Sequence, residues 1–319
     1  MISKAFGFIE SIPKMRLSLL FALVSICLGV SVEDCLAVNR RNLVQTVDQE
    51  ILEDHCSALV STLKKHVWTE SFRENAELIL NDVAPFTVLT EPPFVNPEKR
   101  QLLAAYLDHI AATSDCDNVA CIALALNDRI WSVRDPPIVF EAAKANALNS
   151  YGVEETWERG NGSCTSMSVF LITGLRMLGV PSRLVGTPHW NLGPSKCPLG
   201  DASPDCGNHN WVEVYVPGKG WSFIDQRRPD QQVLPLNSSW FYPDWTSGLD
   251  GTGNHSVYAV SFQNTDSLGN QYPVGKGVVK ADHFPMVWDW TDTRIHGWDM
   301  SAAYKPHRIG HSPPEIKSE

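Results

Sequence analysis

The chain carries a thiol, an imidazole and a carboxylate in the order Cys164, His209 and Asp225. Cys164 directly precedes an apolar stretch with helical spacing, so its sulfur should lie at a helix N-terminus. Free N–H groups and the positive end of the helix dipole favour thiolate over thiol there, and the same groups can stabilise an oxyanion. We therefore expect Cys164 to be a nucleophile in acyl transfer through a thioester. The alternative is a structural cysteine or half of a disulfide.

His209 is the expected general base, because an imidazole titrates near neutral pH and can move a proton in both directions. Asp225 ends the second strand of a predicted hairpin, and strand pairing would bring its carboxylate beside His209. A carboxylate there would hold one tautomer and stabilise the protonated ring. Taken singly, each residue has a simpler explanation, as a surface histidine in a polar loop and as a turn aspartate.

A helix and three strands are expected to position these side chains. Apolar residues recur on one side over 165–178, and Gly179-Val180-Pro181 is a typical helix end. Alternating apolar and polar residues predict three strands, of which the last two form a hairpin: 182–186, 211–216 and 221–225. Residues 157–164 are interpreted as a polar loop that leads into the helix.

The flanking regions have patterns of structure rather than of chemistry. Four apolar stripes with three- and four-residue spacing predict upstream helices: Val47 to Leu63, Phe72 to Leu80, Leu102 to Ile110 and Val119 to Ile130. We interpret these stripes as packing surfaces. Downstream of Pro235, strands are predicted at 257–262 and 277–280 within a tryptophan-rich segment. We expect that segment to pack onto the core, with sugar binding as the alternative.

The N-terminal segment has the features of a signal peptide. Lys14 and Arg16 flank an apolar run from Leu17 to Val30, and a cleavage region is expected near Ala37. The run is shorter than the roughly 20 residues of a spanning helix, and an uncleaved anchor is the alternative. The expected location is therefore secreted or periplasmic.

Export makes disulfides possible for the eight cysteines. Three candidate pairs leave Cys164 unpaired, as a nucleophile must be. They are Cys197 with Cys206, Cys116 with Cys121, and Cys35 with Cys56 if Cys35 survives cleavage. Cys27 lies in the apolar run and is expected to leave with it.

The composition fits a folded globular protein, with 43% hydrophobic and 19% charged residues. The net charge is −10 and no block of Lys and Arg occurs, which argues against a nucleic-acid partner. No Asp-x-Asp loop of the calcium-binding type occurs, and the histidines lack the tight spacing of metal ligands. We therefore expect no metal and no cofactor. Nothing in the sequence indicates an oligomeric state.

Four motifs jointly resemble the transglutaminase-like superfamily over about Thr156 to Asp230. They are Gly162-x-Cys164, Gly179-Val180-Pro181-x-Arg183, His209-x-Trp211-x-Glu213-Val214 and Gly220-Trp221-x-x-x-Asp225. The resemblance implies a papain-like α+β core, a triad of Cys164, His209 and Asp225, and no cofactor. Members of this superfamily include glutamine–lysine crosslinkers, peptidases and amidases, so the resemblance does not decide the reaction subtype.

The chain departs from the animal crosslinking enzymes in two places. A helical lead-in stands where those enzymes have a β-sandwich, and the loop from Cys197 to Cys206 is inserted between Arg183 and His209. The helical lead-in weakens an assignment to protein crosslinking, and the inserted loop is expected at the edge of the cleft.

The sequence thus predicts an α+β protein with a signal peptide (1–37), a helical region (38–145), a transglutaminase-like core (146–234) and a β and aromatic extension (235–319). The expected function is thiol-dependent acyl transfer or amide hydrolysis on protein or peptide substrates through a Cys164 thioester. We expect no nucleic-acid partner and no stable membrane association beyond the signal segment. The alternative is a non-catalytic binding or scaffold module.

Overall fold

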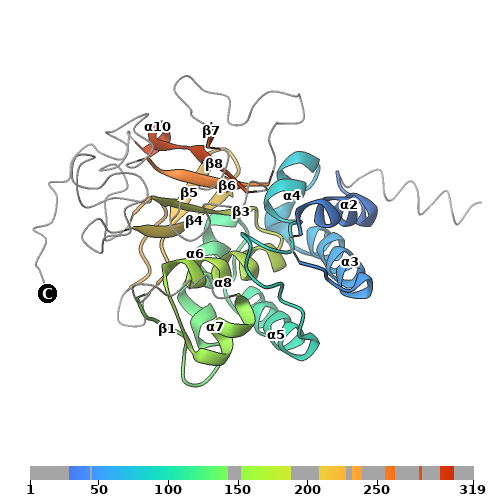
Figure 1. Cartoon of the computed structure of the whole chain (residues 1–319), viewed down its shortest axis with the longest axis horizontal. Coiled ribbons are helices and arrows are strands. Elements are labelled where there is room, and N and C mark those ends of the chain that lie inside the picture. The colour runs from blue at the N-terminus through green and yellow to red at the C-terminus, as the bar shows by residue number, and fades with distance from the viewer. Residues whose placement is uncertain are drawn as a thin grey trace, which may run out of the picture.

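The computed structural model describes residues 29–43, 45–142, 152–187, 208–227, 232–238, 256–262, 280–281 and 295–304. The predicted signal run up to residue 28, the loop with Cys197 and Cys206, and most of the tryptophan-rich segment lie outside these ranges. Within them, helices gather beside a six-stranded sheet whose paired strands are all antiparallel (Figure 1). The α+β class is therefore confirmed.

The N-terminal half is helical, as the apolar stripes predict. Each helix begins at a Ser, Asp or Asn side chain that accepts a backbone N–H of the first turn, which satisfies one of the donors left unpaired at a helix start. The helices are α2 (Val32–Asn42), α3 (Gln49–Lys65), α4 (Ala76–Asp82), α5 (Pro97–Thr113) and α6 (Val119–Arg129), with short 3-10 turns η1 (Val67–Thr69) and η2 (Ile130–Ser132).

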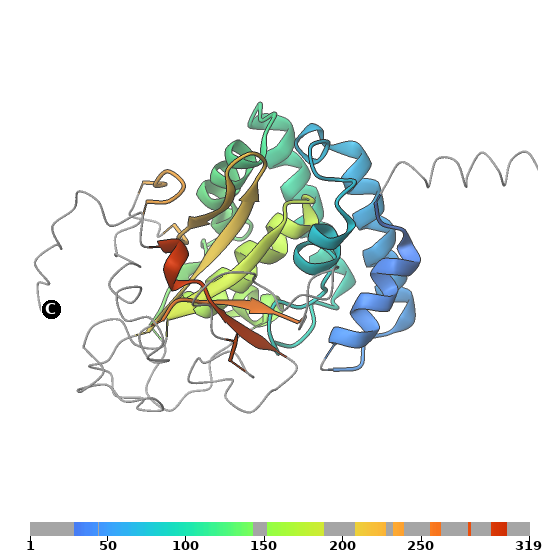
Figure 2. The same cartoon turned by 90° about the horizontal axis from the view of Figure 1, so that it is seen from above.

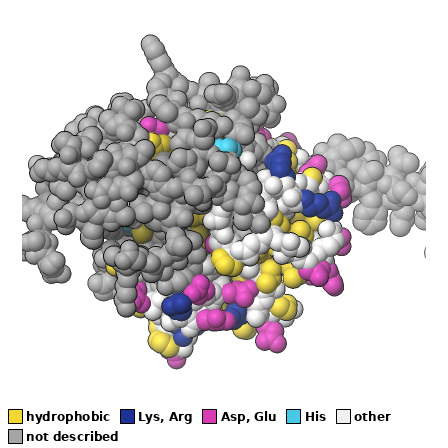
Figure 3. Space-filling model, viewed as in Figure 1, with side chains coloured by type: hydrophobic (Ala, Val, Ile, Leu, Met, Phe, Trp, Pro, Cys, Tyr) yellow, Lys and Arg dark blue, Asp and Glu magenta, His cyan; other side chains and the backbone are white. Residues whose placement is uncertain are grey.

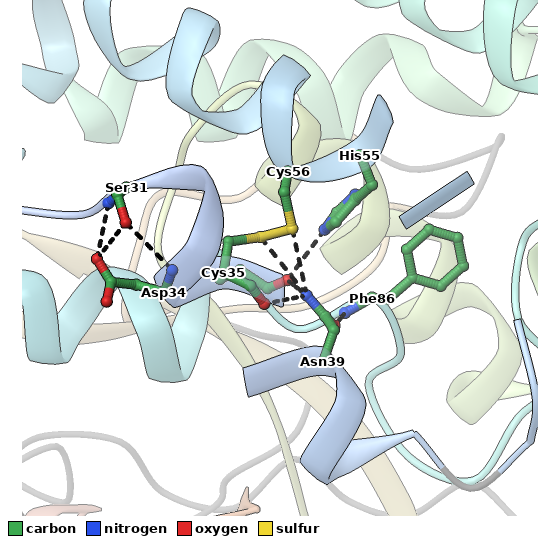
Figure 4. Close-up of a disulfide and its surroundings, with 8 residues drawn as sticks. Ser31, Asp34, Cys35, Asn39, His55, Cys56 and Phe86 are labelled. Carbon is green, nitrogen blue, oxygen red and sulfur yellow. Dashed lines mark hydrogen bonds between the residues drawn. A yellow bond between two sulfur atoms is a disulfide. The ribbon is translucent and has the colours of Figure 1, made fainter. Parts of the chain in front are cut away.

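Helix α2 runs through residue 37, where the predicted signal peptide ends. Ser31 and Asp34 form a reciprocal capping box at its start, and Val30 and Leu36 are buried in the core. Cys35 is joined to Cys56 of α3 by a disulfide (Figure 4). Residues 30–42 thus pack as part of the folded domain, and the charged Glu33-Asp34 pair belongs to a helix start.

Asn39 of α2 attaches a distant extended segment to this disulfide region. Its Nδ2 donates to the Ala84 carbonyl at 2.9 Å, and its Oδ1 accepts the Phe86 N–H at 2.7 Å (Figure 4). One amide side chain therefore fixes the backbone on both sides of Pro85. Asn39 is 1% exposed, so these bonds replace water for two backbone groups that are buried.

The sheet has the strand order β5-β4-β3-β6-β8-β7. Its strands are β3 (Ser182–Thr187), β4 (His209–Val216), β5 (Gly220–Ile224), β6 (Tyr258–Ser261), β7 (Lys280–Ala281) and β8 (His296–Asp299). The hairpin predicted from the sequence is β4 and β5. The residues expected as a C-terminal extension supply β6, β7 and β8 to the same sheet, and β6 pairs directly with β3.

Helix α8 (Cys164–Met177) packs against one face of the sheet and is buried along most of its length (Figure 2). Phe170, Leu171, Ile172 and Leu175 are all 0% exposed. Burial of one such side chain stabilises a fold by roughly 1.5–3 kcal/mol, so this helix is the centre of the core. Its first residue, Cys164, is thereby attached to a helix that is held firmly in the core.

The residues before α8 differ from the predicted polar loop. Residues 153–159 form helix α7 (Val153–Arg159), which ends at Gly160 with a left-handed φ of 71°. Residues after it form β2 (Asn161–Gly162), which pairs in parallel with β1 (Val139–Phe140). Trp157 therefore lies on a helix, where its ring packs 6.2 Å from that of Phe170. The polar and glycine-rich composition of 157–164 hid a helix of only two turns.

The opposite face of the sheet is covered by a smaller apolar cluster that includes α10 (Ser301–Tyr304). Tyr304 packs there with Trp211 of β4 and Phe223 of β5. Its hydroxyl accepts from the Trp211 Nε1–H at 2.9 Å and donates to Glu213 Oε1 at 2.6 Å. Burial and the nearby Glu213 hold the pKa of Tyr304 well above its usual range, so the hydroxyl stays protonated.

Arg183 lies on the neighbouring strand β3, directly opposite Glu213 of β4, and completes this buried group. Its guanidinium donates to Glu213 Oε2 at 2.7 Å and lies over the Trp221 ring, 3.9 Å from its centroid. Arg183 and Glu213 are both 3% exposed. A charge pair removed from water in this way is tolerable only when hydrogen bonds satisfy it, and Tyr304 supplies one of them.

The surface of the described residues carries acidic and basic side chains side by side on the face shown in Figure 3. None of the helices in the described ranges combines the length and the apolar character needed to span a bilayer.

The first prediction concerns the disulfide that anchors α2. The double variant Cys35→Ala/Cys56→Ala should lose about 3 kcal/mol of unfolding free energy, because the bridge closes a 21-residue separation in the unfolded chain. The matched control is Cys116→Ala/Cys121→Ala, whose bridge spans 5 residues and should cost about 2 kcal/mol. Urea unfolding measures both. A larger loss of unfolding free energy in the Cys116→Ala/Cys121→Ala variant would contradict the prediction that the Cys35–Cys56 bridge stabilises the fold more.

The second prediction concerns Tyr304. The variant Tyr304→Phe should lose about 2 kcal/mol of unfolding free energy, because Trp211 and Glu213 each lose a buried hydrogen-bond partner. Tyr106→Phe is the control, since its hydroxyl donates a single bond to the Arg129 carbonyl in a partly exposed position, and it should lose about 1 kcal/mol or less. Equal stability of the two variants would show that the Tyr304 network contributes little.

Candidate active site

Cys164 is the first residue of α8, and its thiol is the free one among the cysteines that the structure describes. Ser163 caps the helix by accepting the Ser166 N–H. Gly162 is required by packing, because a Cβ at this position would lie 2.9 Å from the Ser166 Cβ. The strand, the cap and the helix together hold the sulfur at a helix N-terminus, as the sequence predicts. Cys35–Cys56 and Cys116–Cys121 are the two pairings confirmed here.

His209 is the first residue of β4, and Asp225 directly follows β5. The His209 Nε2 and Asp225 Oδ1 atoms are 2.9 Å apart, and both side chains are 6% exposed. The last paired residues of the hairpin are Val212 and Ile224, so the two residues are not opposite partners. Asp225 reaches His209 because the chain leaves the ladder after β5 and its side chain turns back along β4.

The structure also brings the thiol to the imidazole. The His209 ring and the Asn210 backbone N–H act on the Cys164 thiol and lower its pKa, so both lie close to the sulfur. The Nε2 atom of the same ring faces Asp225. The three predicted site residues therefore form one continuous set across α8, β4 and the residue after β5.

Electrostatics favour the ionised pair. Burial alone would raise the pKa of the Cys164 thiol, but the His209 hydrogen bond and charge, with the Asn210 N–H, leave it lowered. Burial alone would lower the pKa of His209, but the charge and hydrogen bond of Asp225, followed by Cys164, raise it to about 9. Both shifts favour a thiolate beside an imidazolium over the neutral pair.

Asn210 connects β4 to α8 at the residue next to Cys164. Its Nδ2 donates to Thr165 Oγ1 at 2.7 Å, in the first turn of α8. Gly186 lies opposite on β3, and a Cβ there would overlap the Asn210 side-chain oxygen. Gly186 therefore leaves space for the Asn210 side chain, whose bond to Thr165 fixes the position of α8 relative to β4.

Gln226 is a site residue that the sequence analysis missed. Its Nε2 lies 2.8 Å from the Cys164 carbonyl, 2.8 Å from the Asn210 carbonyl, and in contact with Ser168 Oγ. It is 6% exposed. A glutamine next to an aspartate has no signal in a single sequence that would separate this role from that of a surface residue.

Asn127 of α6, in the region interpreted as packing only, holds the chain around Gln226. Its Nδ2 donates to the Asp225 carbonyl at 2.7 Å, and its Oδ1 accepts the Arg227 N–H at 3.0 Å. Arg227 also bonds the Asp128 carbonyl at 2.7 Å. Helix α6 therefore takes over from β4 as the partner of the backbone where the hairpin ladder ends.

The His209 ring rests on Trp211, whose ring centroid is 6.0 Å away at an interplanar angle of 27°. Trp211 is fully buried and bonded to Tyr304, so it is a packing residue. The imidazole is thus supported from the face of the sheet opposite α8.

A metal site needs several donor side chains directed at one point. Among the described residues, no group of three or more His, Cys, Asp or Glu side chains is arranged to hold a metal ion. The predicted lack of a metal and of a cofactor stays a prediction.

Comparisons with known proteins give one family match. Residues 104–226 match the model described as the transglutaminase-like superfamily. The comparison with curated proteins found no match.

Three solved structures show a distant similarity. The periplasmic domain of TgpA from Pseudomonas aeruginosa is 20% identical, with a TM-score of 0.32, over 50% of this chain and 49% of that domain. The same domain bound to ethylmercury is 21% identical, with a TM-score of 0.28, over 43% and 46%. Red sea bream transglutaminase is 12% identical, with a TM-score of 0.29, over 45% and 28%. The aligned part is therefore less than half of each of those chains.

The family match contains all four sequence motifs and the residues Cys164, His209 and Asp225. It begins within α5, so that α6 and its Asn127 belong to the matched segment. Residues 104–226 of this chain are therefore similar to the transglutaminase-like superfamily.

Proposed function

We propose that this protein is a cysteine-dependent enzyme that opens an amide bond of a protein or peptide through a thioester on Cys164. The observation that carries the proposal is the set of interactions from the partly exposed Cys164 thiol through the buried His209 side chain to Asp225. The superfamily match supports thiol-dependent catalysis at the level of the family. The two disulfides fit an oxidising compartment, so we place the enzyme outside the cytoplasm.

In the first half-reaction, the Cys164 thiolate attacks the amide carbonyl and forms a C–S bond. The oxygen becomes an oxyanion, for which the N–H groups at the start of α8 are the donors we propose. The C–N bond then breaks, and the His209 imidazolium gives its proton to the departing nitrogen. The products of this half are a thioester on Cys164, a free amine or ammonia, and a neutral His209.

In the second half-reaction, neutral His209 takes a proton from water or from a primary amine as it attacks the thioester. The C–S bond breaks and the thiolate returns, with the imidazolium stabilised again by Asp225. Attack by water gives a carboxylate, whereas attack by an amine gives a new amide. Both outcomes use the same three residues, so the acceptor decides between hydrolysis and transfer.

The third prediction tests the ionised pair without any substrate. Iodoacetamide at pH 6 should alkylate Cys164 rapidly, because the pKa of its thiol is lowered. An ordinary thiol with a pKa of about 8.5 is thiolate in only about one molecule in 300 at that pH. In His209→Gln the main partner of the thiolate is gone, so labelling at pH 6 should fall at least tenfold.

Peptide mapping by mass spectrometry identifies the labelled cysteine in this experiment. Thermal unfolding of His209→Gln serves as the check that the variant is folded. An unreactive Cys164 in the folded wild type would favour the non-catalytic scaffold alternative.

The fourth prediction concerns turnover and its pH dependence. A peptide digest, with and without an added primary amine, is the substrate, and mass spectrometry separates new termini, deamidation and amine adducts. Activity should fall as the pH rises through about 9, because His209 then loses the proton that the leaving group needs. In Asp225→Asn this alkaline limb should move to lower pH, and the rate should drop by about 10²-fold or more, because the imidazolium loses its stabilising charge.

Cys164→Ala is the matched control and should have no turnover at any pH while it unfolds at the wild-type temperature. Turnover in that folded variant would rule out Cys164 as the nucleophile. An alkaline limb that stays in place in Asp225→Asn would rule out the orienting role of Asp225.

A further inference from the structure

Gln226 occupies the position where the hairpin ladder would continue. The register that pairs Val212 with Ile224 would place Gln226 opposite Asn210, two positions further along. The bond that the Asn210 carbonyl accepts there comes from the side-chain amide of Gln226, at 2.8 Å. The chain can therefore leave the strand after β5 without exposing the edge of β4 beside the imidazole.

The same amide reaches the nucleophile. Gln226 Nε2 lies 2.8 Å from the carbonyl of Cys164 and contacts Ser168 Oγ one turn further along α8. One side chain thus joins the first turn of α8 to the second residue of β4. Asp225, the neighbouring residue, holds His209. Two consecutive residues therefore hold the two reacting groups.

Asn127 fixes this dipeptide from behind. It bonds the carbonyl before Gln226 and the N–H after it, at 2.7 and 3.0 Å, and it is 1% exposed. This is the arrangement that Asn39 makes around Pro85, where one amide bonds the residues on both sides. The two asparagines are equally buried and each bonds the backbone on both sides of one residue, although Asn39 also donates to the Cys35 carbonyl. Asn127 is the one that lies at the site.

We propose that Gln226 is a positioning residue for the Cys164–His209 pair, and that Asn127 holds Gln226 in place. The effect on turnover that this proposal predicts rests on the proposed function. The positioning of the sulfur can be tested on the reactivity of the thiol alone. The stabilisation of the thiolate by His209 and by the Asn210 N–H falls with distance. A loosened α8 would therefore raise the pKa of Cys164 and misalign the sulfur for attack.

The test uses Gln226→Met, which keeps the length of the side chain and removes both amide donors. The pH at which iodoacetamide labelling of Cys164 is half-maximal should rise by about one unit, a tenfold loss of thiolate at a given pH. On the substrate digest, kcat should fall by about 10²-fold with little change in KM, because a shift of about 1 Å in a reacting group costs that much.

Asn127→Leu should give the same two changes, and the double variant with Gln226→Met should be no worse than Gln226→Met alone. This non-additivity is expected because both residues act through one contact. If Asn127→Leu does not fold, Asn127→Asp retains the acceptor for the Arg227 N–H and replaces the donor to the Asp225 carbonyl with an oxygen that repels it. It should give a shift in the same direction.

Asn39→Leu is the matched control. It removes an equally buried pair of bonds far from the site, so it should destabilise the fold while the labelling midpoint and kcat stay at wild-type values. A wild-type labelling midpoint in folded Gln226→Met would overturn the proposal. So would an equal shift in Asn39→Leu, or losses in the double variant that multiply.

Failure of the proposed function gives a different result. In that case the wild type shows no turnover of the digest, yet the labelling midpoints of the variants still report whether Gln226 and Asn127 position the thiol.

Discussion

The arrangement around Cys164 depends on one electrostatic constraint: the His209 ring and the Asp225 carboxylate beside the thiol are largely removed from water, so their charges must be compensated locally. His209 and Asp225 are each 6% exposed, and an isolated charge at such depth would neutralise itself. Each group therefore needs a partner at hydrogen-bonding distance. That need explains why polar side chains that do no chemistry, such as Gln226 and Asn210, are buried around the set.

Meeting this requirement depends on where elements end. Cys164 begins α8, His209 begins β4 and Asp225 follows β5, so each group is free of its own element's hydrogen-bond ladder on one side. The cost is a set of backbone groups that the ladders no longer satisfy. Side chains from other elements take over, as Gln226 does for the Asn210 carbonyl and Asn127 does for the Asp225 carbonyl.

The sequence could predict what is encoded locally. Apolar spacing gave the helices and the β4–β5 hairpin, and the order of Cys164, His209 and Asp225 at element ends gave the members of the site. Gln226 and Asn127 could not be found in this way, because their bonds join residues 62 and about 100 positions apart. Helix α2 was missed for a different reason: its capping box and Cys35 directly follow a hydrophobic run, which resembles the end of a signal peptide.

The C-terminal strands follow from the same requirement when it is applied to the other face of β4. Trp211, which supports the His209 ring, and Glu213 both point to that face, and neither an indole N–H nor a carboxylate can be buried there without a partner. Arg183 satisfies one oxygen of Glu213, and Tyr304 satisfies the other together with Trp211. Because Tyr304 is placed by α10, which follows β8, the described residues 295–304 complete the environment of β4. The Tyr304 hydroxyl is thus an integral part of the fold around β4, because it satisfies two buried polar groups of that strand.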